Sequence, residues 1–160
     1  MKSFMLKNVK RVFLVVLLLA LPALYAQADI LELVRSDLRA EKQAIVTEAM
    51  DLSQEEGAAF WPLYKEYELE LYKVWDERLA VLNDYAQNYE ILTNEKAKEI
   101  FIWNLGVEKK YLKLRKKYFN KISKAVSPIV AARFGQIENY LNMLISAQIM
   151  AEVPVAALPE

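Results

Sequence analysis

The stretches Leu52-Ser53-Gln54-Glu55-Glu56 and Leu92-Thr93-Asn94-Glu95-Lys96 decide the fold, because each carries the signals that begin a helix. In both, an apolar residue precedes Ser53 or Thr93, whose hydroxyl can accept a hydrogen bond from the free amide groups of a first helical turn. Glutamates follow, where the positive end of the helix dipole favours them. The first stretch has the full serine-to-glutamate spacing of a capping box, and the second has only half of it. This repeated helix start predicts an extended protein built from long helices.

The rest of the sequence also favours helix. Glycine occurs only three times, and strong helix formers dominate. Ser127 and Pro128 provide a further start signal, a cap followed by proline at the first helical position. The expected helices cover residues 30–50, 53–88, 93–125 and 128–152. The two central helices would each be about 45 Å long, so we expect an all-α fold of four helices, an elongated helical hairpin or cradle that is kinked at Pro62 and dimeric.

Apolar residues at helical spacing predict the buried faces of the two central helices. The predicted stripe of the helix over 53–88 contains Phe60, Tyr64, Tyr67, Leu71, Trp75, Leu79, Leu82, Tyr85 and Tyr89. The predicted seam of the helix over 93–125 contains Phe101, Leu105, Leu112, Phe119, Ile122 and Val126. Trp61 and Tyr72 lie off the first stripe, so we expect a minority of the aromatic side chains to line a groove or a dimer surface.

The first 28 residues have the anatomy of a secretory signal peptide. Four basic residues precede the apolar run 12–21, and Pro22 and the small-x-small pattern 26–28 follow it. The run is too short to cross a bilayer comfortably, so we expect cleavage after Ala28 and no transmembrane segment in the mature chain. Residues 29–152 would then form one domain, with a disordered tail over 153–160. We expect a periplasmic protein, or a secreted one, that relies on its core because it has no cysteine.

Charge is unevenly distributed along the predicted mature chain. Residues 29–92 hold 15 acidic and 6 basic residues, whereas residues 93–124 hold 10 basic and 3 acidic ones. A strongly basic helix therefore faces, or folds against, an acidic half. Nucleic acid is not an expected partner of an exported chain. Unfolded proteins, anionic lipid or the acidic surface of a partner protein fit this charge better.

The residues that most catalytic and metal sites need are missing from this sequence. It contains no histidine and no cysteine, which removes most nucleophile–base pairs and most transition-metal sites. Outside the leader, Met50, Met143 and Met150 are far apart in sequence and are interpreted as core filler rather than copper ligands. Glycine-rich phosphate loops and nucleophile elbows are absent as well. We expect neither an enzyme nor a cofactor or metal site.

A basic stripe with interleaved aromatic residues stands out on the third helix. The candidate binding residues are Lys109, Lys113, Lys116, Lys117, Lys121, Tyr111 and Tyr118. The lysines recur at intervals of four, three, one and four, which places them on one helical face. One interpretation is a solvated lysine face that pairs with the acidic helices of the same chain. The other is a binding face, on which charge attracts a partner and apolar groups hold it loosely.

The two helix openings resemble the LTxxQ motif of the Spy/CpxP family of periplasmic proteins. The motif is matched as Leu52-Ser53-x-x-Glu56 and Leu92-Thr93-x-x-Lys96, with a conservative change at Glu56 and a non-conservative one at Lys96. The segments Phe60-Trp61-Pro62-Leu63-Tyr64-x-x-Tyr67 and Ala131-Ala132-Arg133-Phe134-x-Gln136-Ile137-Glu138 are similar to features of a divergent branch near this family. The resemblance implies a kinked helical hairpin that dimerises into a cradle. It also implies ATP-independent chaperoning of unfolded periplasmic proteins, or restraint of an envelope-stress sensor kinase.

Three hypotheses about function follow. A holdase-type chaperone would bind many unfolded chains weakly through the basic and aromatic surface. A regulatory adaptor would bind a single partner, such as a sensor kinase domain, and would ignore unfolded chains. A structural helical protein would be fully packed, and it would bind neither unfolded chains nor a single partner.

Overall fold

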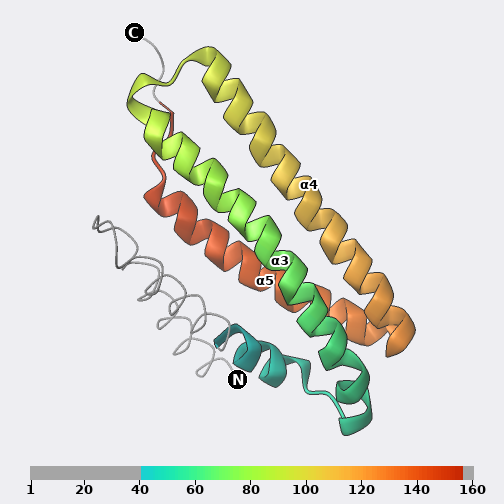
Figure 1. The fold of residues 1–160 in the computed structure, drawn as a ribbon. Helices are drawn as coiled ribbons and strands as arrows, with labels where there is room; N and C mark the ends of the chain where they lie inside the picture. Colours follow the sequence, from blue (N-terminus) through green and yellow to red (C-terminus); the bar gives the residue numbers. More distant parts are fainter. Residues whose placement is uncertain (1–40, 157–160) are drawn as a thin grey trace, which may run out of the picture. The chain divides into compact units, whose positions relative to one another are not determined.

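The computed structural model describes residues 41–156, which are helical throughout most of their length and contain no strand. The elements after residue 51 are α3 (Gln54–Asn88), the short 3-10 helix η2 (Tyr89–Ile91), α4 (Asn94–Ala125) and α5 (Pro128–Glu152) (Figure 1). The predicted all-α fold is confirmed. The predicted signal peptide, the first part of the helix expected over 30–50 and residues 157–160 of the predicted tail lie outside the described residues.

The described residues fall into two units, 41–51 and 52–156. In the first unit, residues 41–50 are helical. This helix ends where predicted, because Asp51 adopts a left-handed backbone conformation with φ of 47°. Aspartate is one of the few residues other than glycine that tolerate this conformation, which is common just after a helix.

All three predicted caps form in the second unit. The Ser53 hydroxyl accepts a hydrogen bond from the Glu56 amide, and the Glu56 carboxylate accepts one from the Ser53 amide, which completes the capping box. Thr93 accepts from the backbone amide of Lys96 without the reciprocal bond. Ser127 accepts from the amide of Val130, with proline at the first position of α5. The sequence-based helix starts and ends are therefore correct for α3, α4 and α5.

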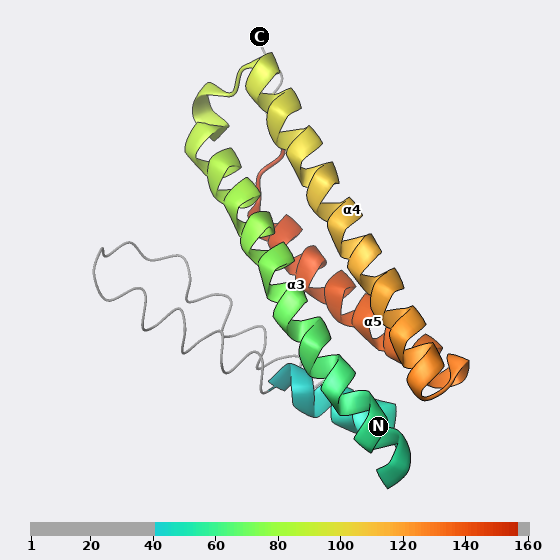
Figure 2. The same cartoon turned by 45° about the vertical axis from the view of Figure 1, so that its right-hand side comes forward.

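The second unit is a bundle of three helices. The 35 residues of α3 and the 32 residues of α4 run antiparallel, at lengths of about 52 and 48 Å. Figures 1 and 2 show α5 returning alongside both helices from the turn after α4. None of the helices within residues 41–156 combines the length and the apolar character that a membrane span requires.

An aromatic cluster forms the core at the end of the bundle where α3 begins. The ring of Phe134 in α5 packs edge-on against Phe60, Tyr64 and Tyr67 of α3, with ring centroids 5.2–6.1 Å apart. Tyr67 also packs against Tyr118 of α4 at 5.3 Å. Edge-to-face contacts at these distances suit the aromatic quadrupole. The sequence segments 60–67 and 131–138 therefore pack on each other.

Glu138 of α5 is a buried carboxylate in this core, with 2% of its surface exposed. It accepts a hydrogen bond of 2.7 Å from the hydroxyl of Tyr67. Burial and the nearby negative charge of Glu138 raise the pKa of Tyr67, because both disfavour ionised tyrosine. A buried charge of this kind is tolerated only where it is hydrogen-bonded.

The buried line of α3 departs from the predicted stripe after Leu71. The first half is confirmed, since Phe60, Tyr64, Tyr67 and Leu71 are buried. In the second half, Val81 is buried with Ile100 and Val107 of α4, while Leu79 is exposed. The line continues at alternating steps of three and four, through Val74, Arg78 and Val81, and rejoins the predicted stripe at Tyr85. Because Arg78 occupies one of these positions, a search for apolar residues does not find this part of the buried line.

The predicted seam of α4 is wrong for four of its six residues. The buried line instead contains Ile100, Val107, Leu114, Tyr118 and Ile122. Phe101, Leu105, Leu112 and Phe119 are exposed, at 39–65% of their surface. Both lines have helical spacing and similar apolar character, so the sequence of α4 alone cannot choose between them. The choice is made by its contacts with α3.

The methionine expectation also needs correction. Met50 is fully buried, but Met143 is 56% exposed and Met150 is exposed as well. These two residues lie on the side of α5 away from Phe134 and Leu141, which are buried. Only Met50 is core filler.

Candidate functional site

A ladder of ion pairs joins α3 to α4 along one side of the contact between the two helices. Lys121 pairs with Glu66 at 2.7 Å, Lys117 with Glu70 at 2.6 Å, and Lys110 with Glu77 at 2.6 Å. Each step of four or seven residues along α3 is matched by the same step back along α4, as antiparallel helices require. All six side chains are substantially exposed, so each pair contributes at most about 1 kcal/mol to stability. The ladder matches the antiparallel register of the two helices and adds little to stability.

Tyr118 ties the ladder to the core. Its ring is fully buried, and its hydroxyl donates a hydrogen bond of 2.9 Å to Glu70. The ammonium groups of Lys117 and Lys121 lie 5.3 and 4.8 Å from the centre of its ring, within cation–π range. The hydrogen bond from Lys117 lowers the pKa of Glu70, and the bond from Tyr118 acts in the same direction. Glu70 is therefore held as a carboxylate that receives both donors.

The rest of the basic stripe faces outward. Lys109, Lys113 and Lys116 are exposed, and within residues 41–156 none of them forms an ion pair. At 100° per residue, these three lysines lie on the side of α4 opposite its buried line. The stripe is thus divided between a paired row that contacts α3 and a free row that faces solvent.

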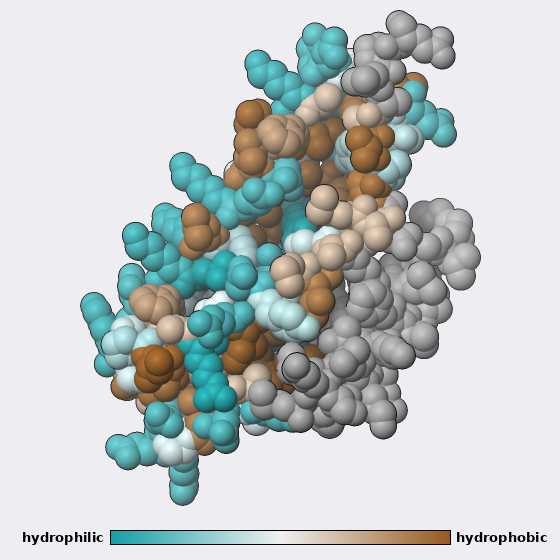
Figure 3. All heavy atoms as spheres, turned by 180° about the vertical axis from the view of Figure 1, so that it is seen from behind, coloured by the Kyte–Doolittle hydropathy of each residue, from teal (hydrophilic) through white to brown (hydrophobic). Residues whose placement is uncertain are grey.

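An apolar line runs beside the free lysines. It consists of Phe101, Leu105, Leu112 and Phe119, and the last three follow one another at intervals of seven residues. The line is about 27 Å long from end to end at the helical rise. We call these four residues together with Lys109, Lys113 and Lys116 the outward surface of α4. The edge of the molecule formed by α4, at the left of Figure 3, shows hydrophobic groups interrupted by protruding hydrophilic ones.

On its other flank, the apolar line borders the contact between α4 and α5. Arg115 donates hydrogen bonds to the backbone carbonyl of Gly135 at 3.2 Å and to the side chain of Asn139 at 3.3 Å. Its guanidinium also lies 5.6 Å from the centre of the Tyr111 ring. These contacts hold α4 against α5, so the outward surface is displayed on a helix that is fixed on both of its other sides.

The structure separates the predicted site residues into two groups. Lys109, Lys113 and Lys116 lie on the outward surface. Lys117, Lys121 and Tyr118 belong to the ladder, and Tyr111 is half-buried between the helices. Burial raises the pKa of Tyr111 to about 12. Among the motif residues, Leu52, Ser53, Glu56, Leu92, Thr93, Ser127 and Pro128 shape the helix starts, while Trp61 contacts the aromatic core and Pro62 is exposed.

The apolar half of the outward surface was missed by sequence reasoning, because its four residues were assigned to the core. A signal was present in the acidic residues of α3. Glu66, Glu70 and Glu77 repeat at steps of four and seven, and Lys110, Lys117 and Lys121 repeat at the same steps. Matching these two patterns would have predicted that the line of Phe101, Leu105, Leu112 and Phe119 faces outward.

Within residues 41–156, no group of three or more acidic side chains could hold a metal ion. Comparison with protein families, with curated proteins and with solved structures finds no significant match.

Proposed function

We propose that this protein binds unfolded or partner proteins on the outward surface of α4, as an ATP-independent, chaperone-like protein of the cell envelope. The observation that carries the proposal is the line of Phe101, Leu105, Leu112 and Phe119, exposed beside three lysines that have no ion-pair partner among the described residues. Exposed apolar groups that gather on one surface are typical of sites that bind other proteins.

The two components of the surface would play different roles. Lysines act over longer distances than apolar contacts, so they would attract acidic stretches of a client and raise its association rate. The apolar side chains would then cover exposed apolar groups of the client, without requiring one particular sequence. Such binding needs no nucleotide and no catalytic group, in keeping with a sequence that has neither histidine nor cysteine.

Further support for an envelope location comes from the sequence. The predicted signal peptide over residues 1–28 would export the chain, and the two helix openings resemble the LTxxQ motif of the Spy/CpxP family. A protein that works outside the cytoplasm, where ATP is not supplied, needs a binding mechanism that does not consume it. We place the proposed activity in the periplasm on these grounds.

The test is suppression of aggregation. A chemically denatured reporter protein is diluted into buffer without ATP, and light scattering is followed with and without the purified protein. We expect suppression near equimolar ratio, and we expect the double variant Leu112→Gln/Phe119→Gln to lose most of it. The matched control is Leu69→Gln/Met143→Gln, which removes two side chains of 59% and 56% exposure from α3 and α5.

The outcomes separate the hypotheses. Suppression that the α4 variant loses and the control retains would support a chaperone-like role on this surface. Equal loss in both variants would contradict the assignment to α4. No suppression by the wild-type protein would contradict a general chaperone and would favour an adaptor that binds one specific partner.

A further inference from the structure

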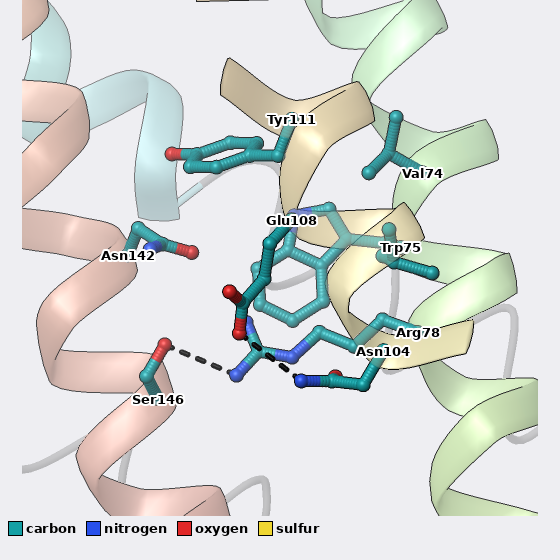
Figure 4. A pocket seen from close by; sticks show the side chains of 9 residues that line it. Val74, Trp75, Arg78, Asn104, Glu108, Tyr111, Asn142 and Ser146 are labelled. Carbon is teal, nitrogen blue, oxygen red and sulfur yellow. Dashed lines mark hydrogen bonds between the residues drawn. The ribbon is translucent and has the colours of Figure 1, made fainter. Parts of the chain in front are cut away.

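A cleft of about 150 Å³ lies between α3, α4 and α5. An engineered apolar cavity of about this volume accepts a benzene molecule, so the cleft has room for a small organic ligand. Its lining contains both apolar and polar side chains, shown in Figure 4: Val74, Trp75, Arg78, Asn104, Val107, Glu108, Tyr111, Asn142 and Ser146.

Arg78 is the unusual residue of this cleft. It occupies a position on the buried line of α3 where the neighbouring positions hold Val74 and Val81. Its guanidinium lies 4.9 Å from the centre of the Trp75 ring and donates a hydrogen bond of 3.1 Å to the hydroxyl of Ser146. Burial lowers the pKa of Arg78. A guanidinium has five donors, and among residues 41–156 only one of them is accepted by a protein group.

Polar side chains from the other two helices meet Arg78 at the same level. Asn104 occupies a position on the buried line of α4, between Ile100 and Val107, and Asn142 and Ser146 lie one turn apart on α5. A polar layer in a helical bundle can serve only to fix register. Register alone would be served by polar groups that satisfy one another, whereas here most donors of the arginine remain available to the cleft.

Glu108 places an opposite charge in the same cleft. Its carboxylate accepts a hydrogen bond of 3.0 Å from the side-chain amide of Asn104. Its charge acts on Arg78, but the two side chains form no direct ion pair. Figure 4 shows the carboxylate of Glu108 and the guanidinium of Arg78 ending in the same space between the helices. A ligand in this space would meet a positive group and a negative group together.

We propose that this cleft binds a small zwitterion of amino-acid size, with its carboxylate on Arg78 and its ammonium group on Glu108. A planar carboxylate matches the fork of guanidinium donors. A side chain of modest size would lie against Val74, Val107 and the indole of Trp75. A ligand that carries only one of the two charges would leave the other protein charge without its partner. The proposal does not depend on protein binding by the outward surface of α4.

The experiment is an NMR titration of the purified protein. The indole signal of Trp75 and the side-chain amide signals of Asn104 and Asn142 report on the cleft. The probes are glycine, L-serine and L-valine, together with 3-methylbutanoate and 2-methylpropylamine, which keep the side chain of valine and one charge each. Probes are added up to about 20 mM, which covers a Kd of about 1 mM. We expect saturable shifts of the cleft signals with at least one amino acid, and binding about tenfold weaker for both single-charge analogues.

Variants test the two charged groups separately. Arg78→Gln and Glu108→Gln should each weaken binding about tenfold, because each removes a charged hydrogen-bonding partner. Lys113→Gln, on the outward surface, is the control and should leave the affinity unchanged. Glu108 is exposed, so its variant keeps the test valid if Arg78→Gln fails to fold by circular dichroism. The proposal is overturned if no amino acid gives a saturable shift, if 3-methylbutanoate binds as tightly as L-valine, or if Glu108→Gln binds unchanged.

Discussion

The ammonium group of Lys117 lies 2.6 Å from a carboxylate oxygen of Glu70, and this contact helps to determine which face of α4 meets solvent. The same carboxylate accepts the hydroxyl of the buried Tyr118. One acidic residue of α3 therefore fixes both a core aromatic residue and a surface lysine of α4. With α4 held in this rotation, Leu112 and Phe119 point away from the core.

The ladder should show measurable but small coupling. Lys110→Glu places two like charges together at Glu77 and should lower the free energy of unfolding by up to about 1 kcal/mol. Adding Glu77→Lys restores opposite charges and should recover most of this loss. Urea unfolding of the two single variants and the double variant gives the coupling energy. A coupling energy of zero, at low salt, would contradict the ion pair.

Charge reversal on the outward surface should affect client capture rather than stability. Lys109→Glu/Lys113→Glu/Lys116→Glu should weaken client capture severalfold and leave the thermal midpoint nearly unchanged, because these lysines form no ion pair among the described residues. Lys117→Glu is the comparison, since it breaks the contact with Glu70 and should lower stability. Light scattering and thermal unfolding are measured on both proteins. A folded triple variant that captures clients at full strength would rule out a role for these lysines.

The helix caps should differ in their contribution to stability. Ser53→Ala removes the hydroxyl that accepts from the Glu56 amide and so breaks a complete capping box, which should cost about 1 kcal/mol or more. Thr93→Ala removes a cap whose hydrogen bond has no reciprocal partner, so it should cost less. Ser123→Ala is the control, because this serine lies inside α4 and caps nothing; the change should be neutral or slightly stabilising. Equal losses for Ser53→Ala and Ser123→Ala in urea unfolding would contradict the capping assignment.

Stability should fall at alkaline pH. Burial is the largest effect that raises the pKa of both Tyr64 and Tyr67. A raised pKa in the folded state means that the stability from these tyrosines is complete below their unfolded pKa of about 10 and is lost as the pH rises above it. Each should reduce the free energy of unfolding by about 1.4 kcal/mol per pH unit in that range.

The pH profile has a matched pair of variants. Tyr64→Phe should flatten the alkaline slope, because it removes one buried ionisable group. Tyr140→Phe changes a tyrosine that is 39% exposed and serves as the control. Urea unfolding between pH 8 and the onset of alkaline unfolding provides both slopes. Identical slopes for the two variants would argue against the role given to Tyr64.

Local signals in the sequence were sufficient to predict where the helices begin and end. They were insufficient to predict which face of each helix is buried. Ser53, Thr93 and Ser127 act within four residues of themselves, so their roles can be deduced without a partner helix. The rotation of α4 depends on its contacts with α3, which include Tyr67 and Val81 in the core and, at the surface, glutamates 33–55 residues away from the lysines they contact. Two apolar lines on α4 have helical spacing, and only contacts with residues distant in sequence determine which of them is buried.

Arg78 and Glu138 illustrate a second limit. Both are charged residues on inward-facing positions, where a sequence pattern leads one to expect apolar side chains. Glu138 is explained by the hydroxyl of Tyr67, which a search along either helix alone cannot reveal. Arg78 misled the assignment of the α3 stripe after Leu71, and it lines the cleft for which we propose a ligand. Departures from a pattern of this kind are expected where a structure serves a function.

The most direct test of the protein-binding proposal is site-specific photo-crosslinking on α4. A photoreactive amino acid is introduced at Leu112 in one protein and at Leu69 of α3 in another, two positions with similar exposure of 65% and 59%. Each protein is mixed with a chemically denatured reporter protein and irradiated, and covalent adducts are quantified on a gel. The proposal predicts adducts at position 112 severalfold above those at position 69. Equal yields at the two positions, or adducts at position 69 alone, would contradict binding on the outward surface of α4.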